Sequence, residues 1–226
     1  MMRAIIFDFD GVISDSEPLH LRAFNEVLAR FGIEINNEEY YGQYLGFTDF
    51  YCFKAIADKH RLGLDANGIE KLIEQKSRTF EELVRKEGSI IEGVPGFLRM
   101  LRENNVRTAI CSGALRPDIE AALSDTQLLS FFEVIVTAED IEKGKPDPEG
   151  FLLALQKLNE KEREQIAVDE CVVVEDSHWG LEAATAAGMH TVAVTNSYGA
   201  EELKTADKIV DNLGAVVIAD LNGLCR

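Results

Sequence analysis

The chain has 226 residues, and its 40 Asp and Glu against 23 Lys and Arg give a formal net charge of -17 at pH 7. A chain this acidic repels nucleic-acid phosphates, which argues against a nucleic-acid partner. Hydrophobic residues make up 46%, which is enough for a folded core and too much for a disordered chain. The length fits one large domain, or one domain that carries an insertion.

The sequence shows neither the pattern of a targeting signal nor paired spacing among its cysteines. No apolar run approaches the roughly 18 residues of a membrane helix, and Asp8 and Asp10 interrupt the first apolar run too early for a signal peptide. We therefore expect a soluble, cytoplasmic protein with no membrane partner; a monomer is the first expectation, although the sequence leaves the oligomeric state open. The four cysteines are widely scattered, which predicts free thiols and argues against zinc. They are Cys52, Cys111, Cys171 and Cys225.

Short apolar runs alternate with helical patterns along most of the chain. The run at residues 4–7 stops at an aspartate, as expected for a strand buried on both faces that ends in a loop. Similar runs occupy residues 108–111, 134–136, 172–174 and 191–194, and apolar residues at three-and-four spacing between them predict helices over 97–104, 119–123, 150–158 and 180–187. This alternation predicts an α/β fold with a doubly wound parallel sheet and right-handed crossovers.

Residues 16–88 break this alternation, because the segment is long, helical in pattern and has no strand-like run. Helices are predicted over 19–31, 37–44, 49–60 and 66–86, separated by Gly32, Gly46 and Gly63. The sequence therefore predicts an all-helical domain over 16–88, inserted into an α/β domain made of 1–15 and 89–226. The connections near 15–18 and 88–95 are hinge candidates.

Polar residues follow four of the predicted strands, where an open parallel sheet binds its ligands. They are Asp8 with Asp10, Ser112 with Gly113, the loop with Gly144, Lys145 and Pro146, and Glu175 with Asp176. Asp, Ser and Gly are also ordinary turn and capping residues, and the first pair alone favours capping. Four carboxylates at one sheet edge, however, would repel one another strongly without a bound cation. Ligands that are all oxygen favour Mg²⁺ over zinc.

A magnesium ion held by few carboxylates usually completes its shell with water and substrate phosphate. The Ser112 hydroxyl and the Gly113 amide, at an expected helix entry, suit a phosphoryl oxygen. Lys145 could neutralise both a carboxylate and the phosphoryl group, although by itself it would be interpreted as a solvated loop lysine. Pro146 fixes the backbone beside Lys145 and not beside its competitor Lys143.

Two aspartates in one turn suit phosphoryl transfer. A carboxylate can attack phosphorus to give an aspartyl-phosphate, and the second can protonate the leaving oxygen and then deprotonate the hydrolytic water. Attack by an anion on a dianion requires the cation and Lys145. We therefore interpret Asp8 as the nucleophile and Asp10 as the acid and base.

Four segments resemble, in order, the motifs of the haloacid dehalogenase superfamily of phosphohydrolases. They are residues 8–16, 112–113, 145–148 and 174–177, and the resemblance covers the whole chain. It is greatest to the branch containing β-phosphoglucomutase and small sugar-phosphate phosphatases, in which a helical cap follows the first motif. The resemblance implies a Rossmann-like core with an inserted cap domain.

The resemblance also implies roles for single residues. Asp8 would be nucleophile and metal ligand, Asp10 would bind Mg²⁺ through its backbone carbonyl, and Asp176 would be the third ligand. Glu175 would act nearby, through a water.

Phosphoryl binding is implied for Ser112, Gly113 and Lys145. His20, in a segment that begins at Asp15, matches a histidine that in the family reaches the acid/base aspartate when the cap shuts. A single histidine on an amphipathic helix is more often a packing residue.

The family contains several chemistries, and Asp10 separates them. The dehalogenases, the P-type ATPases and the phosphonate hydrolases all lack or replace this second aspartate, so its presence favours an ordinary phosphate ester. β-Phosphoglucomutase holds a distal phosphate with a cap-loop arginine, where this chain has Asp49 after Gly46, and Ala114 and Leu115 intervene before Arg116. An aspartate at that position would repel a phosphate.

We therefore expect a Mg²⁺-dependent phosphatase acting on a small phosphorylated metabolite, with a sugar phosphate as the first candidate. A sugar phosphomutase is the alternative. A non-catalytic phosphate-binding module would be signalled by loss of Asp8, Asp10 or Lys145, and all three are present. Lys76 and Arg78 are further candidates for contacting substrate, although solvated lysines are the rule on helices.

Overall fold

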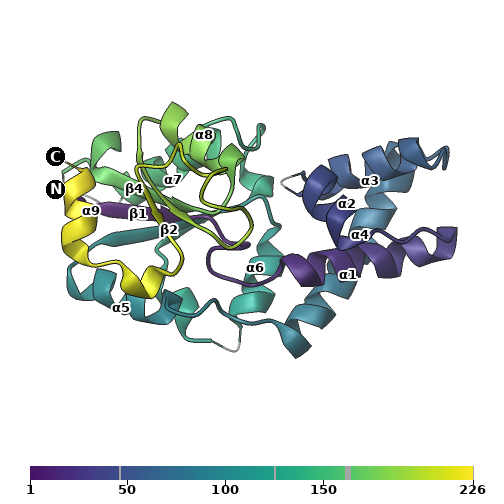
Figure 1. The fold of residues 1–226 in the computed structure, drawn as a ribbon, viewed down its shortest axis with the longest axis horizontal. Helices are drawn as coiled ribbons and strands as arrows, with labels where there is room; N and C mark the ends of the chain where they lie inside the picture. The colour runs from purple at the N-terminus through teal and green to yellow at the C-terminus, as the bar shows by residue number, and fades with distance from the viewer. Residues whose placement is uncertain (46, 125, 161–163, 226) are drawn as a thin grey trace. The chain divides into compact units, whose positions relative to one another are not determined.

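The computed structural model describes residues 1–45, 47–124, 126–160 and 164–225, and the chain divides into two compact units (Figure 1). The α/β unit contains Met1–Asp15 and Ile90–Arg226. The helical unit contains Ser16–Ser89.

One parallel sheet organises the α/β unit and confirms the predicted fold class. Within the described residues it has six strands in the order β3-β2-β1-β4-β5-β6. The strands are β1 (Ala4–Phe7), β2 (Arg107–Cys111), β3 (Val134–Val136), β4 (Cys171–Glu175), β5 (His190–Val194) and β6 (Lys208–Val210). The sequence analysis missed β6, because this three-residue edge strand is only half-buried and lacks a continuous apolar run.

Helices cover both faces of this sheet, and the alternation of side chains along the strands explains the continuous apolar runs. The helices of this unit are α5 (Val94–Glu103), α6 (Arg116–Leu123), α7 (Glu149–Asn159), α8 (His178–Ala186) and α9 (Ile218–Leu224). Ile5 and Phe7 pack into the cluster that contains α5 and α9 residues, whereas Ala4 and Ile6 pack against α7 and α8 (Figure 1). Burying a side chain such as Phe7 contributes about 1.5–3 kcal/mol. The sequence analysis did not predict α9.

The helical unit has its own apolar core. Its helices are α1 (Glu17–Leu28), α2 (Asn37–Glu39), α3 (Asp49–Lys59) and α4 (Ala66–Glu87). The predicted helix over residues 37–44 is a short α-helical segment followed by a π-helical turn, Tyr40–Tyr44. Side-chain caps set the starts of the two longer helices after it: Thr48 accepts a hydrogen bond from the backbone of Tyr51, and Asp65 accepts one from Gly68. Gly46, expected as a turn residue, lies outside the described residues.

All four cysteines are buried thiols, as the scattered spacing predicts. Burial raises the pKa of Cys111 and of Cys171 to about 12, so both are protonated at neutral pH and behave as small apolar groups.

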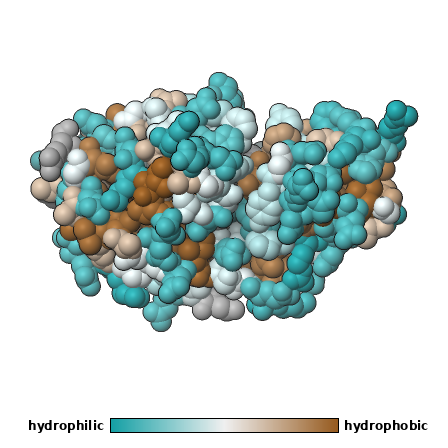
Figure 2. All heavy atoms as spheres, in the orientation of Figure 1, coloured by the Kyte–Doolittle hydropathy of each residue, from teal (hydrophilic) through white to brown (hydrophobic). Residues whose placement is uncertain are grey.

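The surface is mostly hydrophilic on the face that is drawn in Figure 2, and apolar residues gather there in separate patches. Among the described residues, no helix has the length and apolar character needed to cross a membrane.

Candidate active site

The predicted polar residues meet at the carboxyl edge of the sheet because their strands are neighbours. Strand β1 lies between β2 and β4, so Asp8 is flanked by the loop that follows β2 and by the end of β4. The Asp8 backbone donates a hydrogen bond to Val174 at 2.9 Å. Ser112 follows β2, and Glu175 is the last residue of β4.

Lys145 joins two of these carboxylates. Its Nζ donates to Asp8 and, at 2.6 Å, to Glu175 Oε1, and it lies 5.1 Å from the ring centroid of Phe151. Burial alone would lower the pKa of Lys145, but Asp8 and Glu175 raise it well above its usual range. The side chain is therefore a fixed ammonium group. Its competitor Lys143 is mostly exposed and pairs with Asp147 at 3.6 Å.

Negative charge exceeds positive charge at this edge of the sheet. Asp8, Glu175 and Asp176 are all buried, and each offers an oxygen within 4.8 Å of the others. Burial raises the pKa of Asp8 to about 8 against the opposing charge of Lys145, and Glu175 and Asp10 add to the rise. A divalent cation among these oxygens would lower that pKa and restore the anionic form of Asp8. Because all the donors are carboxylate oxygens, the site fits Mg²⁺.

Glu175 differs from the other carboxylates, because protein donors occupy both of its oxygens. Oε1 accepts from Lys145, and Oε2 accepts from the Asp176 backbone at 3.0 Å and from the Ser177 backbone and hydroxyl at 3.0 and 2.8 Å. Helix α8 packs so closely on this side chain that a Cβ at Gly180 would lie 1.7 Å from Oε1. This arrangement favours a supporting role for Glu175 and leaves Asp8 and Asp176 better suited to bind a cation directly.

The turn after Asp10 requires a glycine. Gly11 has a φ of +74°, and a Cβ there would lie 1.9 Å from Asp176 Oδ2. Because glycine has no Cβ, the Asp8–Asp10 turn packs directly against the Asp176 carboxylate.

The sequence analysis missed two residues of the loop that follows β5. Asn196 Nδ2 donates to the Gly11 carbonyl at 2.7 Å, and the Ser197 hydroxyl donates to Asp176 Oδ2. The rule that ligands bind beyond the carboxyl ends of parallel strands could have found them, because β5 pairs with β4.

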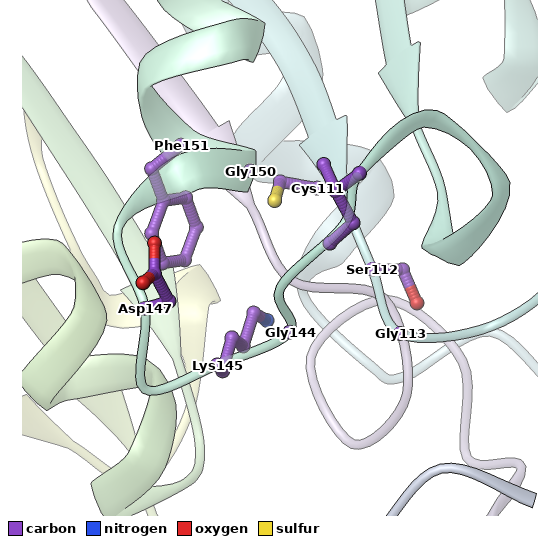
Figure 3. Close-up of a pocket in the computed structure, with 9 residues that line it drawn as sticks. Cys111, Ser112, Gly113, Gly144, Lys145, Asp147, Gly150 and Phe151 are labelled. Carbon is purple, nitrogen blue, oxygen red and sulfur yellow. The ribbon is translucent and has the colours of Figure 1, made fainter. Parts of the chain in front are cut away.

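A pocket opens between the loop after β2 and the loop that leads into α7 (Figure 3). Its lining residues are Cys111, Ser112, Gly113, Ile141, Gly144, Lys145, Asp147, Gly150 and Phe151. A Cβ at Gly113 or Gly144 would meet no atom within 4 Å, so the space before both glycines is open to a ligand.

One local prediction at this pocket is wrong. Gly113 does not stand at a helix entry, because α6 begins at Arg116. Instead, Ser112 Oγ accepts a hydrogen bond from the Ala114 backbone at 3.0 Å, which closes a tight turn and fixes the hydroxyl. The Arg116 side chain donates to the Ile135 carbonyl at 3.0 Å and to Asp140 at 3.3 Å, so it anchors this loop.

The helical unit contains a buried lysine, in contrast to the solvated residue that its place on a helix predicts. Lys76 is 1% exposed; its Nζ lies 2.7 Å from His20 Nδ1 and 3.0 Å from the Asp49 carboxylate. The rings of Phe24 and Phe80 lie 5.1 and 4.9 Å from the same nitrogen.

Two other candidates of this unit, His20 and Arg78, differ in exposure. His20 stacks on Phe80 with centroids 3.9 Å apart, which fixes its ring plane. Arg78 is exposed and lies 3.9 Å from Glu74, as expected for a solvated helix residue.

Comparisons with known proteins agree on one family. The family described as haloacid dehalogenase-like hydrolase matches residues 5–194. The chain is 28% identical over 218 residues to the phosphorylated carbohydrates phosphatase of Thermotoga maritima, and the matched region covers 96% of this chain and 94% of that protein. It is 28% identical over 192 residues to the fructose-1-phosphate phosphatase of Escherichia coli, covering 84% of this chain and 95% of that one. The crystal structure of CbbY from Rhodobacter sphaeroides in complex with phosphate has a TM-score of 0.86 at 26% identity, covering 98% of this chain and all of the other.

Proposed function

Because the chain is a phosphatase that belongs to the haloacid dehalogenase-like hydrolases, we propose that it hydrolyses a small phosphate monoester with Mg²⁺, through an aspartyl-phosphate on Asp8. The observation that carries this proposal is the set of buried oxygens from Asp8, Glu175 and Asp176 around a single fixed ammonium group. Such a site binds a cation and a phosphoryl group together.

Magnesium would be held by Asp8, Asp176 and the backbone carbonyl of Asp10, with Glu175 as a supporting carboxylate. When bound, it supplies the positive charge that allows an anionic nucleophile to approach a phosphate dianion.

The reaction steps belong to residues of the chain. Asp8 attacks phosphorus, the ester bond breaks, and Asp10 gives its proton to the leaving oxygen. Asp10 then takes a proton from the water that attacks the aspartyl-phosphate, and inorganic phosphate leaves. Lys145 holds Asp8 in position and contributes charge opposite the phosphoryl oxygens.

We assign phosphoryl binding to the open pocket beside Gly113 and Gly144. Ser112 and Gly113 both line this pocket, and a Cβ added at Gly113 would meet no atom within 4 Å, which supports their role as donors to a phosphoryl oxygen. His20 is proposed as a substrate-binding residue of the helical unit, and its contacts with Lys76 and Phe80 would keep its ring oriented.

A sugar phosphate is the proposed substrate class. The names of two relatives support this class, since one acts on phosphorylated carbohydrates and the other on fructose 1-phosphate. Water, and not a sugar hydroxyl, is proposed to accept the phosphoryl group, because Asp49 contributes a carboxylate already paired with Lys76 and no positive charge for a second phosphate.

The experiment supplies β-glucose 1-phosphate and a panel of sugar monophosphates with Mg²⁺, with and without a trace of glucose 1,6-bisphosphate. Free phosphate and glucose 6-phosphate are both followed. The proposal expects phosphate release that does not depend on the bisphosphate. Rapid, bisphosphate-dependent formation of glucose 6-phosphate with little free phosphate would identify a mutase instead.

A further inference from the structure

The loop after β5 contacts the site through consecutive residues. Asn196 Nδ2 donates to the carbonyl of Gly11 at 2.7 Å, and the hydroxyl of Ser197 donates to Asp176 Oδ2. The ring of Tyr198 meets that of His178, in the first turn of α8, edge to face at 5.0 Å. Residues 195–198, here named the β5 loop, therefore touch the nucleophile turn, a candidate metal ligand and the helix that follows that ligand.

The Asp176 carboxylate contacts both this loop and the nucleophile turn. A Cβ at Gly11 would lie 1.9 Å from Asp176 Oδ2 and 2.9 Å from Ser197 Oγ. Ser197 donates its hydroxyl hydrogen to the same carboxylate oxygen. This hydrogen bond restricts rotation of the Asp176 carboxylate.

The β5 loop is itself anchored at its start. The Thr195 backbone donates to Val210 at 3.1 Å, and the Thr195 hydroxyl donates to Asp211 at 2.9 Å. Tyr198 packs beside buried Leu181 and Leu203. A donor mounted on an anchored loop orients its acceptor more firmly than a mobile surface hydroxyl would.

We propose that Ser197 is a positioning residue for the cation site, which orients the Asp176 carboxylate, and that Asn196 holds the Gly11 turn against it. This inference rests on the proposed magnesium site. Hydrogen-bonding partners behind a metal ligand restrict its rotation and tune its donor strength, and their loss typically costs 10–100-fold in metal affinity. Ser197 would thus set how tightly the site holds its cation without touching the substrate.

Metal affinity tests this directly, without turnover. Chelator-treated protein is titrated with Mn²⁺, and the free ion is followed by electron paramagnetic resonance. Four chains are compared: wild type, Ser197→Ala, Ser197→Thr and Thr195→Val. Thr195→Val removes a hydroxyl that lies in the same loop but bonds Asp211 and not the acidic cluster. Thermal melting of the metal-free chains verifies that each is folded.

The expected result is a 10–100-fold rise in the Mn²⁺ dissociation constant for Ser197→Ala. Ser197→Thr, which keeps the donor, and Thr195→Val should both stay within about threefold of wild type, well below that loss. If Ser197→Ala bound Mn²⁺ as tightly as wild type, this inference would be overturned and the proposed metal site would stand. The same would follow if Ser197→Ala and Thr195→Val lost Mn²⁺ affinity equally. Absence of Mn²⁺ binding by the wild type would overturn the proposed metal site as well.

Discussion

Two lysines with little solvent exposure, Lys145 in the α/β unit and Lys76 in the helical unit, have surroundings that differ in charge. Lys145 faces the carboxylates of Asp8 and Glu175, with Asp176 beside them. Lys76 faces the carboxylate of Asp49, together with an imidazole and two aromatic rings.

The difference distinguishes two kinds of charged cluster. In the helical unit the Lys76 ammonium pairs with the Asp49 carboxylate, and the aromatic rings add cation–π attraction. In the α/β unit one ammonium group faces several carboxylates, so a further cation would stabilise them. A lysine of low exposure therefore indicates nothing about function by itself, whereas the charges around it do.

The largest expected effect comes from Asp8→Asn, which keeps the size of the side chain and removes the proposed nucleophile. Turnover should fall on the order of 10⁴-fold or more, while the melting temperature is maintained or raised, because one unbalanced charge is gone. Steady-state phosphate release and thermal melting give the two readouts. Asp169→Asn, an exposed substitution just before β4, is the control, and turnover near the wild-type level in Asp8→Asn would assign the attack to another group.

Removal of metal should have the next largest effect. EDTA is expected to lower turnover at least about 10³-fold, since the excess carboxylates then repel the phosphate, and Mg²⁺ should restore it. Mg²⁺ should also raise the melting temperature of the chelated chain. Undiminished hydrolysis in fully chelated protein would contradict the charge comparison.

Lys76→Met should affect stability first. It leaves the Asp49 carboxylate, which is 23% exposed, without its partner, and the cost is about 3 kcal/mol of unfolding free energy. The double variant Asp49→Leu/Lys76→Met removes both charges and should recover most of that loss. Urea denaturation followed by circular dichroism measures both.

The matched control for that pair is Lys71→Met, an exposed position on the same helix, which should cost less than about 0.5 kcal/mol. If the double variant were as unstable as Lys76→Met, charge balance would not be what stabilises the cluster.

The smallest expected effect concerns a balanced cluster of the α/β unit. Asp140 accepts hydrogen bonds from Thr137, from Arg116 at 3.3 Å and from Lys157 at 3.0 Å. Burial opposes them, but the backbone and hydroxyl of Thr137 and the ammonium group of Lys157 lower the pKa of Asp140 to about 2. Its unfolded value is about 3.9, so the stabilisation is complete above that pH and is lost as pH falls through about 2.

Asp140→Asn should therefore cost about 1 kcal/mol at pH 7, a value reduced by solvent screening of this partly exposed group. The cost should shrink as the pH is lowered toward 2. Urea denaturation at pH 7, 4 and 2.5 tests the trend. The control is Asp58→Asn, which removes a carboxylate from an exposed ion pair on a helix. A cost that stayed constant over this range would show that the carboxylate charge is not responsible.

Local patterns accounted for most of the α/β unit. Strands such as residues 4–7 are apolar on both faces, and this signal survives in the sequence because helices cover both sides of the sheet. The same reasoning failed at β6 and α9, which are short or half-buried and so carry little periodic signal. At the site, the aspartates and Lys145 were predicted because each follows a strand, and the order of neighbouring strands brought them together.

Composition, apolar runs and helical spacing by themselves determined that this is an acidic α/β protein with a helical insertion and polar residues after its strands, since these features are set by residues near one another in sequence. Tertiary structure alone decided the rest. Ser197 contacts Asp176, which is 21 residues away in sequence, and Lys76 contacts Asp49, which is 27 residues away. The donors that occupy both oxygens of Glu175 are also brought there by the fold. Whether a charged residue is balanced depends on which partners packing brings within hydrogen-bonding distance, and that sum is set in three dimensions.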